Sequence, residues 1–362
     1  MDTTQLIKQI KLNCTTSDAH FWGYYSICGL LLRLRELYRN EHSLMPWDEI
    51  PRAEISDWIA ATEAQWNILE DHPLKLLEIG DRLYDPFEVD GVNDLLSGQG
   101  LVYGGGYGRF NKPTFFLARL LEITERGDYR IYYAGRELCR DLSTSVAMLQ
   151  GRCIFMRIDS LKMLLWDKLQ ELRSRKFGGV LMEAFASCGI EGPSLSPEEL
   201  PAKIDSLASR LSDLFILHEL GEAFEDEYAD EWLSILGRNQ DRVTEFYVRG
   251  IKDLLADTSE KGPLKRITDS MDMPLLNFYI VFMDGIRREI FPEIVAAFQT
   301  FMEDGRKWSL IEHARIKGYE KARELRGHVL KLWREGKGET LGTSIKESLS
   351  DKWHVQRARP TG

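Results

Sequence analysis

The sequence lacks the marks of an exported or membrane-spanning protein. Its first residues contain no basic segment followed by an apolar stretch. The best apolar run, residues 274–283, is interrupted by Asn277 and is much shorter than the roughly 20 residues that a membrane-spanning helix needs. The five cysteines form no C-x-x-C pair, and their odd number suits buried thiols in a reducing compartment better than a disulfide framework. We therefore expect a cytoplasmic protein without membrane contact.

Positive charge is scarce over most of the chain. There are 47 Lys and Arg residues against 57 Asp and Glu residues, which gives a formal net charge of −10. Residues 305–362 reverse this balance, with 14 basic and 7 acidic side chains. Because affinity for phosphate backbones comes from accumulated Lys and Arg, we expect no nucleic-acid binding except through this basic C-terminal tail. Acids and bases alternate there at helical spacing, which favours a solvated, salt-bridged face.

Serine-triad, Walker and zinc-knuckle patterns are also absent, so no enzyme class follows from a motif. The chain does have the composition of a globular protein, with 43% hydrophobic and 29% charged residues among 362. A chain of this length can bury a real core and has room for about two domains or one large helical body.

Apolar residues recur mainly with the period of an α-helix. This periodicity predicts helices at about 24–38, 55–69, 144–176, 202–227, 230–257, 274–304 and 308–335. Seven glycines between Gly91 and Gly108 interrupt it and favour turn or hairpin backbone. Two β-rich stretches, 101–103 and 129–133, are expected to pair as short strands around a helix at about 113–125. The expected fold is therefore mainly α, a multi-helix bundle-like architecture with a small Gly-rich β-hairpin or strand pair inserted in the N-terminal half.

The clearest linker-like stretch follows Cys188, where two glycines and three prolines occur between residues 189 and 201. We place a domain boundary there. The predicted organisation is an N-terminal helical domain at 1–188 with a β insertion around 100–135, a C-terminal all-helical domain at 189–335, and a flexible tail at 336–362.

The sharpest local signal is a histidine and an acid on the apolar face of one predicted helix. On a helical wheel at about 100° per residue, His218 and Glu222 continue the stripe of Leu207 and Leu211, while Glu219 lies at its margin. An unpaired carboxylate on such a face is costly, so Glu222 needs a cation, a proton, a hydrogen-bond partner or a metal ion. Two side chains four residues apart on one face can both reach a divalent ion, as in the His and Glu sites of helical bundles.

We accordingly predict His218 and Glu222 as ligands of Fe, Mn or Zn, with Glu219 as a further ligand or general base. The stretch resembles the H-E-x-x-H helix of the zincin metalloproteases, with Glu222 in place of the second histidine. The zincin mechanism uses both histidines on zinc, so protease activity is not carried over. The alternative is an internal ion pair, in which His218 and Glu222 pair with each other or with an arginine such as Arg157.

A site with two metal ions would need carboxylates from other helices. Glu36 is predicted on the solvent side of its helix, away from the apolar face. Glu63 and Glu70, which flank the apolar face of the next helix, and His20 remain candidates.

The second candidate site is the glycine-rich segment, because bare backbone N–H groups ahead of a helix attract anions. The segment follows neither the G-x-x-x-x-G-K-[ST] order nor the G-x-G-x-x-G order. Arg109, Lys112, Arg136 and Arg140 are nevertheless expected to surround a carboxylate or phosphate if the two short strands bring them together. A plain tight hairpin is the alternative.

Two classes of function follow. One is a binding or scaffold protein whose surfaces engage a protein or a small anionic partner, as the missing catalytic motifs, the uneven charge and these four cationic residues suggest. The other is a His/carboxylate metal-dependent enzyme of the helical-bundle kind. A helical RNase of the HEPN type is an outside reading, because Arg323 and His328 fit its R-x4-6-H spacing. Two further Arg and His pairs in the chain fit equally well, so spacing alone singles out no catalytic pair.

Overall fold

The computed structural model describes residues 2–174, 179–191, 198–238, 242–283, 285–335, 341–345 and 347. The chain divides into two compact units, which are described separately. Unit 1 comprises residues 1–176 and 192–212, and unit 2 comprises residues 177–191 and 213–362. Among the described residues, no helix combines the length and the apolar character that a membrane-spanning segment requires. Most of the predicted tail, 336–362, lies outside the described residues.

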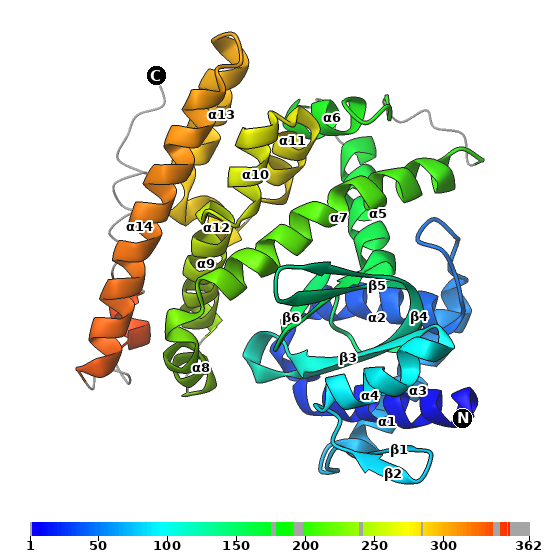
Figure 1. Ribbon diagram of the computed structural model, residues 1–362. Helices are drawn as coiled ribbons and strands as arrows, with labels where there is room; N and C mark the ends of the chain where they lie inside the picture. Colours follow the sequence, from blue (N-terminus) through cyan, green and yellow to red (C-terminus); the bar gives the residue numbers. More distant parts are fainter. Residues whose placement is uncertain are drawn as a thin grey trace. The chain divides into compact units, whose positions relative to one another are not determined.

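Unit 1 is built on a mixed, curled sheet of five strands in the order β3-β4-β5-β7-β6 (Figure 1). Strands β5 and β7 are parallel, and the other neighbours are antiparallel. A separate two-stranded sheet pairs β1 with β2. The strands are β1 (Leu77–Ile79), β2 (Arg82–Tyr84), β3 (Leu101–Tyr107), β4 (Pro113–Arg126), β5 (Tyr129–Arg140), β6 (Ala147–Gln150) and β7 (Cys153–Arg157).

The prediction of a mainly helical bundle with a small hairpin is therefore wrong. The segment predicted as a helix at 113–125 is the long strand β4, and a tight turn at Gly127 joins it to β5. Gly127 has a φ of +60°, a conformation that glycine adopts without a steric penalty. The register between β4 and β5 shifts three times between Leu117 and Glu122. These irregularities remove the strict alternation by which a strand is recognised in a sequence.

The triple glycine belongs to β3 rather than to a turn. Gly104 pairs with Phe116 of β4, and a Cβ atom on Gly104 would lie 2.0 Å from Cε1 of that ring. Glycine is needed at position 104 because the ring of Phe116 fills the space that a Cβ atom would occupy. The predicted short strand at 101–103 is thus the beginning of a strand of seven residues.

Five helices complete the described part of unit 1, together with the first half of α7. Residues Leu6, Ile10 and Cys14 of the first helix pack into the apolar core of the sheet. This helix is absent from the predicted set. The helix predicted at 144–176 begins later, because residues 147–157 form β6 and β7. The helices are α1 (Thr3–Phe21), α2 (Ile27–Glu41), α3 (Arg52–Leu69), α4 (Val89–Leu96) and α5 (Ile158–Ser174).

Unit 2 is helical throughout its described residues. Proline at the first or second position starts three of its helices, at Pro263, Pro274 and Pro292. The helix predicted at 274–304 is divided into three, and Pro292 begins the third of them. The helices are α6 (Gly179–Ala186), the second half of α7 (Leu200–Phe224), α8 (Ala229–Arg238), α9 (Arg242–Thr258), α10 (Pro263–Ser270), α11 (Met273–Phe282), α12 (Gly285–Ile290), α13 (Pro292–Glu303) and α14 (Trp308–Arg334).

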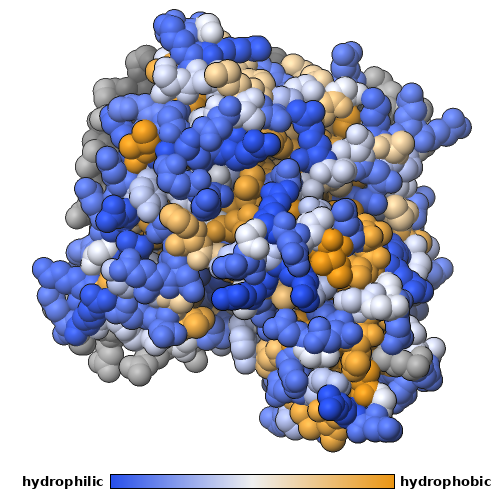
Figure 2. Space-filling view, viewed as in Figure 1, coloured by the Kyte–Doolittle hydropathy of each residue, from blue (hydrophilic) through white to orange (hydrophobic). Residues whose placement is uncertain are grey.

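Helix α9 is the centre of unit 2, since it contacts α8, α10, α12 and α14. The prediction of a mostly helical chain is confirmed by unit 2, although the sheet of unit 1 was not foreseen. Figure 2 shows a face dominated by hydrophilic side chains with scattered apolar ones, some of them near its lower end, where Figure 1 places β1 and β2. Leu76 and Leu83 at this small sheet are both exposed.

Candidate metal centre

Helices α7 and α9 of unit 2 cross at a glycine. A Cβ atom on Gly221 would lie 2.3 Å from the carbonyl oxygen of Ala256, which is closer than any Cβ approaches another atom. Glycine therefore lets the two backbones come together here. Because His218 and Glu222 flank Gly221 on α7, the crossing directs them at the acidic side chains that flank Ala256 on α9.

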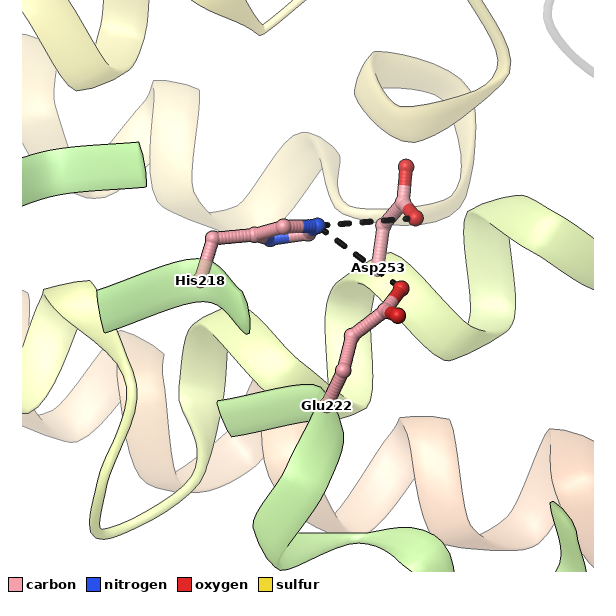
Figure 3. Close-up of side chains that lie close together, drawn as sticks. All are labelled: His218, Glu222 and Asp253. Carbon is pink, nitrogen blue, oxygen red and sulfur yellow. Dashed lines mark ion pairs between the residues drawn. The ribbon is translucent and has the colours of Figure 1, made fainter. Parts of the chain in front are cut away.

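Three side chains from these two helices point toward one position (Figure 3). The Nε2 atom of His218 lies 3.8 Å from Oε1 of Glu222 and 3.9 Å from Oδ1 of Asp253. One ligand atom from each residue lies within 4.8 Å of the other two. The side chains are 20%, 23% and 29% exposed, so the group is accessible from solvent.

The opposite side of the histidine ring is held by a buried acid. Nδ1 of His218 lies 2.7 Å from Oδ1 of Asp257, whose side chain is only 4% exposed. The hydroxyl of Tyr279 on α11 donates to Oδ2 of the same carboxylate at 3.1 Å. A ring that donates its Nδ1 proton to a carboxylate presents Nε2 in a fixed direction, as metal-ligating histidines do.

The charges of the cluster act strongly on one another. Burial by itself would lower the pKa of the His218 ring, but the carboxylates of Asp257, Asp253 and Glu222 outweigh it and raise that pKa to about 10. Burial raises the pKa of Asp253 above its usual range. Burial acts in the same direction on Glu222, but Lys252 and His218 dominate, and its pKa is lowered. The ring is therefore protonated at neutral pH without a metal, and an ion that binds Nε2 must displace this proton.

Two cationic side chains border the cluster. Nζ of Lys252 lies 3.9 Å from Oε2 of Glu222. Arg287 of α12 places Nε 3.9 Å from Oδ2 of Asp253 and Nη1 3.8 Å from Oδ2 of Asp257. These separations lie within ion-pair range but are longer than hydrogen bonds.

One imidazole and two carboxylates form a ligand set that suits Zn, Mn or Fe. Around an ion with bonds of about 2.1 Å, neighbouring ligand atoms lie about 3.0–3.4 Å apart. The two distances from Nε2 of His218 exceed these values by about 0.4–0.9 Å, so the two acidic side chains must move inward to bind an ion. The donor set therefore fits a divalent ion, with Asp257 and Tyr279 as the outer support.

The helical wheel drawn from the sequence singled out two of these three residues. His218 and Glu222 lie together, as their spacing requires, whereas Glu219 is half-buried on α7 and is not among the three ligand residues. Asp253 and Asp257 were missed. They are four residues apart among the apolar residues of α9, so a helical wheel drawn for α9 would have shown them in the same way.

The other candidate ligands lie in unit 1. Glu63, Glu70 and His20 are exposed. Glu36 is not on the solvent side as predicted, because it is 8% exposed and its carboxylate faces Arg140 at 3.4 Å. Helix α2 is covered by the sheet on that side, which the apolar pattern of the helix does not reveal.

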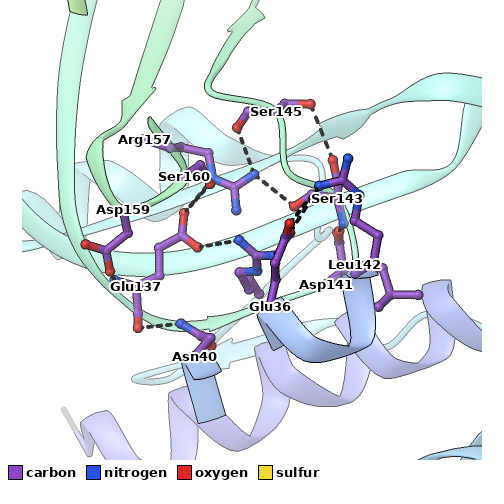
Figure 4. Close-up of polar contacts among 12 residues, drawn as sticks. Glu36, Asn40, Glu137, Asp141, Leu142, Ser143, Ser145, Arg157, Asp159 and Ser160 are labelled. Atoms are coloured by element: carbon purple, nitrogen blue, oxygen red, sulfur yellow. Dashed lines mark hydrogen bonds and ion pairs between the residues drawn. The ribbon is translucent and has the colours of Figure 1, made fainter. Parts of the chain in front are cut away.

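The four residues predicted to bind an anion do not form one group. Lys112 is buried, and its Nζ lies 2.9 Å from Asp18 and 3.4 Å from Asp141. Arg109 is exposed in the turn after β3. Arg136 and Arg140 both lie on β5, at a second cluster of charged residues. Figure 4 labels Glu36, Glu137 and Asp159 among the acids of this cluster. There Arg136 faces Asp159 at 3.6 Å, and Arg140 faces Glu36 and Glu137 at 3.4 and 3.6 Å. Anion binding by these residues stays a prediction.

The residues named in the ion-pair and RNase alternatives, and the cysteines, lie at other places in the structure. Arg157 pairs with Glu137 at 2.6 Å inside unit 1. Arg323 and His328 are both exposed on α14. Of the cysteines, Cys14, Cys139 and Cys153 are buried as expected, whereas Cys28 is exposed.

Two family models match the chain. The N-terminal domain of a family of unknown function (DUF6866) matches residues 5–157, and the C-terminal domain of the same family matches residues 162–352. No curated protein and no solved structure matches the chain. The candidate metal centre lies entirely within the region matched by the C-terminal domain.

Proposed function

The chain belongs to the DUF6866 family, whose function is unknown, and we propose that it is a metal-dependent enzyme whose divalent ion is held by His218, Glu222 and Asp253. The observation that carries this proposal is that the two nitrogens of the His218 ring have different surroundings. Nδ1 is bonded to Asp257 at 2.7 Å, while Nε2 faces two carboxylates that are too far away for hydrogen bonds.

This spacing favours an ion over a simple ion pair. A protonated ring that served only as a cation would be expected to bond Glu222 or Asp253 at Nε2, as it bonds Asp257 at Nδ1. Instead, three ligand atoms from α7 and α9 surround a position that each can reach. The ligand set contains nitrogen and oxygen and no thiolate, which favours Zn, Mn or Fe.

Three protein ligands leave coordination positions open, as in catalytic rather than structural sites. When bound, the ion supplies a Lewis acid that lowers the pKa of a bound water and polarises an oxygen of the substrate. Asp257 orients the ring, and Tyr279 fixes Asp257. Glu219, which neighbours His218 on the half-buried side of α7, remains our candidate for the general base.

The cations beside the ligands indicate the class of substrate. Three carboxylates, from Glu222, Asp253 and Asp257, face Lys252 and Arg287. With a neutral imidazole and a divalent ion, the net charge of the group is plus one. We therefore propose an anionic substrate, a phosphate ester or a carboxylate, that meets the ion and Lys252.

We also propose a cytoplasmic location. The exposed free thiol of Cys28 suits a reducing compartment.

Metal analysis of the untagged, full-length protein tests the proposal. We expect one ion per chain, lost in His218→Ala and retained in the control His328→Ala, which removes an exposed histidine of the same unit. Asp257→Asn is expected to weaken binding about 10–100-fold, because it removes the partner that orients the ring. An ion present at 100 times its Kd should stabilise the native state by about 2.7 kcal/mol. Protein that gains no stability from Zn, Mn or Fe and purifies without metal overturns the proposal.

The anionic substrate has a separate test. Calorimetric titration with inorganic phosphate is expected to show binding to the Mn-loaded protein and none to protein stripped with EDTA. Lys252→Met should weaken phosphate binding and leave one Mn per chain. Equal phosphate binding by loaded and stripped protein would remove the substrate class while leaving the metal site intact.

A further inference from the structure

Unit 1 contains a pocket with a mostly cationic wall, which the proposed metal site does not involve. The pocket has a volume of about 270 Å³ and is lined by Arg35, Arg39, Glu49, Ile50, Arg52 and Ile55. Arg35 and Arg39 lie on successive turns of α2, and Arg52 is the first residue of α3. Three cations and a single acid therefore line this pocket, in a chain whose net charge is −10.

Two of the three arginines are not neutralised by the protein. The side chains of Arg35 and Arg52 are exposed and form no ion pair or hydrogen bond with any described residue. Glu49 lines the same pocket, but its carboxylate pairs with neither of them. A concave surface lined by one sign of charge concentrates ligands of the opposite sign. The charge of the wall therefore favours an anionic ligand.

The third arginine, Arg39, is half-buried and is held in place through one nitrogen. Its Nη1 donates to the backbone carbonyls of Met45 at 3.2 Å and Asp48 at 2.5 Å. Its Nε and Nη2 donate to no other described residue. Burial lowers the pKa of Arg39, and the positive charge of Arg35 lowers it further, although Asp48 acts in the opposite direction. Arg35 is thus close enough to repel Arg39, and an anion bound between them would relieve this repulsion.

The spread of the cations and the rest of the wall indicate the class of anion. The Cα atoms of Arg35 and Arg39 are about 6 Å apart along α2, and Arg52 belongs to a different helix. A ligand with two separate carboxylates reaches more of these groups than one compact anion does, and guanidinium groups bind carboxylates through paired hydrogen bonds. Ile50 and Ile55 offer apolar surface to a carbon chain. Pockets for drug-sized ligands measure about 300–1,000 Å³, so this pocket suits a smaller molecule.

We propose that this pocket binds a short aliphatic dicarboxylate, with the two carboxylates at the guanidinium groups and the carbon chain against the two isoleucines. Glu49 weakens the binding, because its carboxylate repels those of the ligand. The site belongs to unit 1 and needs no metal ion, so it is independent of the proposed metal site.

Calorimetric titration of the metal-free, full-length protein with succinate, glutarate and adipate in turn tests the proposal. We expect one molecule of at least one of these dicarboxylates to bind per chain. Arg35→Gln and Arg52→Gln should each weaken this binding at least about 10-fold, because each removes a charge-assisted contact. Glu49→Gln should strengthen it. Since both arginines are exposed and unpaired, the two variants should keep the Tm of the ligand-free wild type, which separates lost binding from lost folding.

Matched controls separate this pocket from general attraction of anions. Arg82→Gln removes an exposed arginine of β2 in the same unit and should leave dicarboxylate binding unchanged. Lys252→Met, at the proposed metal site, should leave it unchanged as well. Acetate and inorganic phosphate each carry one compact anionic group and are expected not to displace the dicarboxylate.

Four outcomes overturn the proposal. They are no binding of any of the three dicarboxylates, equal losses in Arg35→Gln and Arg82→Gln, loss of binding in Lys252→Met, and displacement by phosphate. Each of them leaves the metal analysis of unit 2 unaffected, so the two proposals fail separately.

Discussion

The two units handle buried charge in opposite ways. In unit 1, Arg157 lies 2.6 Å from Glu137 and Lys112 lies 2.9 Å from Asp18, and all four side chains are at most 5% exposed. In unit 2, Nε2 of His218 remains 3.8 Å or more from the two acids that it faces, and the three side chains are 20–29% exposed. Opposite charges that are buried in close contact form ion pairs that hold a fold together. Charges that are farther apart and accessible to solvent leave room for a ligand. The residue types are similar, so the spacing makes the difference.

The largest effect is expected when the close contact of unit 1 is broken. Arg157→Met leaves Glu137 buried without its nearest cation, and we expect a loss of about 3–5 kcal/mol in the free energy of unfolding. Chemical denaturation monitored by circular dichroism measures this loss. As a control, Arg334→Ala removes an exposed partner of Glu231 and should cost at most about 1 kcal/mol. Equal losses in the two variants would contradict a structural role for the buried pair.

An intermediate effect is expected at the helix crossing of unit 2. Gly221→Ala places a Cβ atom against the carbonyl oxygen of Ala256, so α7 must move away from α9. We expect a loss of about 1–3 kcal/mol together with a loss of metal affinity, measured by denaturation and by calorimetry. Gly327→Ala is the matched control, because a Cβ atom there meets no neighbouring atom and alanine favours the helix by about 0.5–1 kcal/mol. Unchanged metal affinity in Gly221→Ala would show that the crossing does not position the ligands.

A further effect concerns pH and again contrasts the units. Burial raises the pKa of Asp18 to about 7, and the nearby carboxylate of Asp141 acts in the same direction. The buried cation Lys112 lies close to both acids and offsets this rise only in part. The folded state thus binds the proton of Asp18 more tightly than the unfolded state does. The associated stability is present below pH 4 and is lost as the pH rises toward 7. For His218, whose pKa is raised to about 10, the corresponding loss falls between about pH 6.5 and 10.

Denaturation of metal-free protein at a series of pH values measures both windows. The stability difference between the wild type and Asp18→Asn should decrease between pH 4 and 7, and that between the wild type and His218→Gln should decrease between pH 7 and 10. Parallel profiles for the wild type and Asp18→Asn would show that Asp18 does not titrate in its window.

The sequence predicts the helices of unit 2 better than the sheet of unit 1. Residues 308–335 are correctly predicted as a helix, since α14 covers 308–334 and its charges and apolar residues follow one local period. In β4 the period is broken by register shifts, and the five residues 114–118 are all buried, so neither face can be recognised from alternation. The pair Gly127-Asp128 was an available hairpin signal, because a two-residue turn that begins with glycine joins antiparallel strands.

The candidate metal site was only half predictable for a related reason. His218 and Glu222 are neighbours on one helix, and their relation follows from the helical period alone. Asp253 and Asp257 join them through the crossing of α7 and α9, which depends on the close approach at Gly221. The burial of Glu36 against Arg140 depends in the same way on contacts more than 100 residues apart in the chain. Local periodicity carries no information on such pairings.

The continuity of α7 has a practical consequence for dissecting this chain. Its residues 200–212 belong to unit 1 and its residues 213–224 to unit 2, and α5, with its buried Leu161 and Leu165, also belongs to unit 1. Separate expression of residues 5–157 and 162–352 would therefore remove α5 and residues 200–212 from the first fragment. The apolar faces of these helices would then be exposed on the second fragment. We expect fragments made to assign an activity to either half to aggregate. Point substitutions in the full-length chain are therefore the better way to assign an activity.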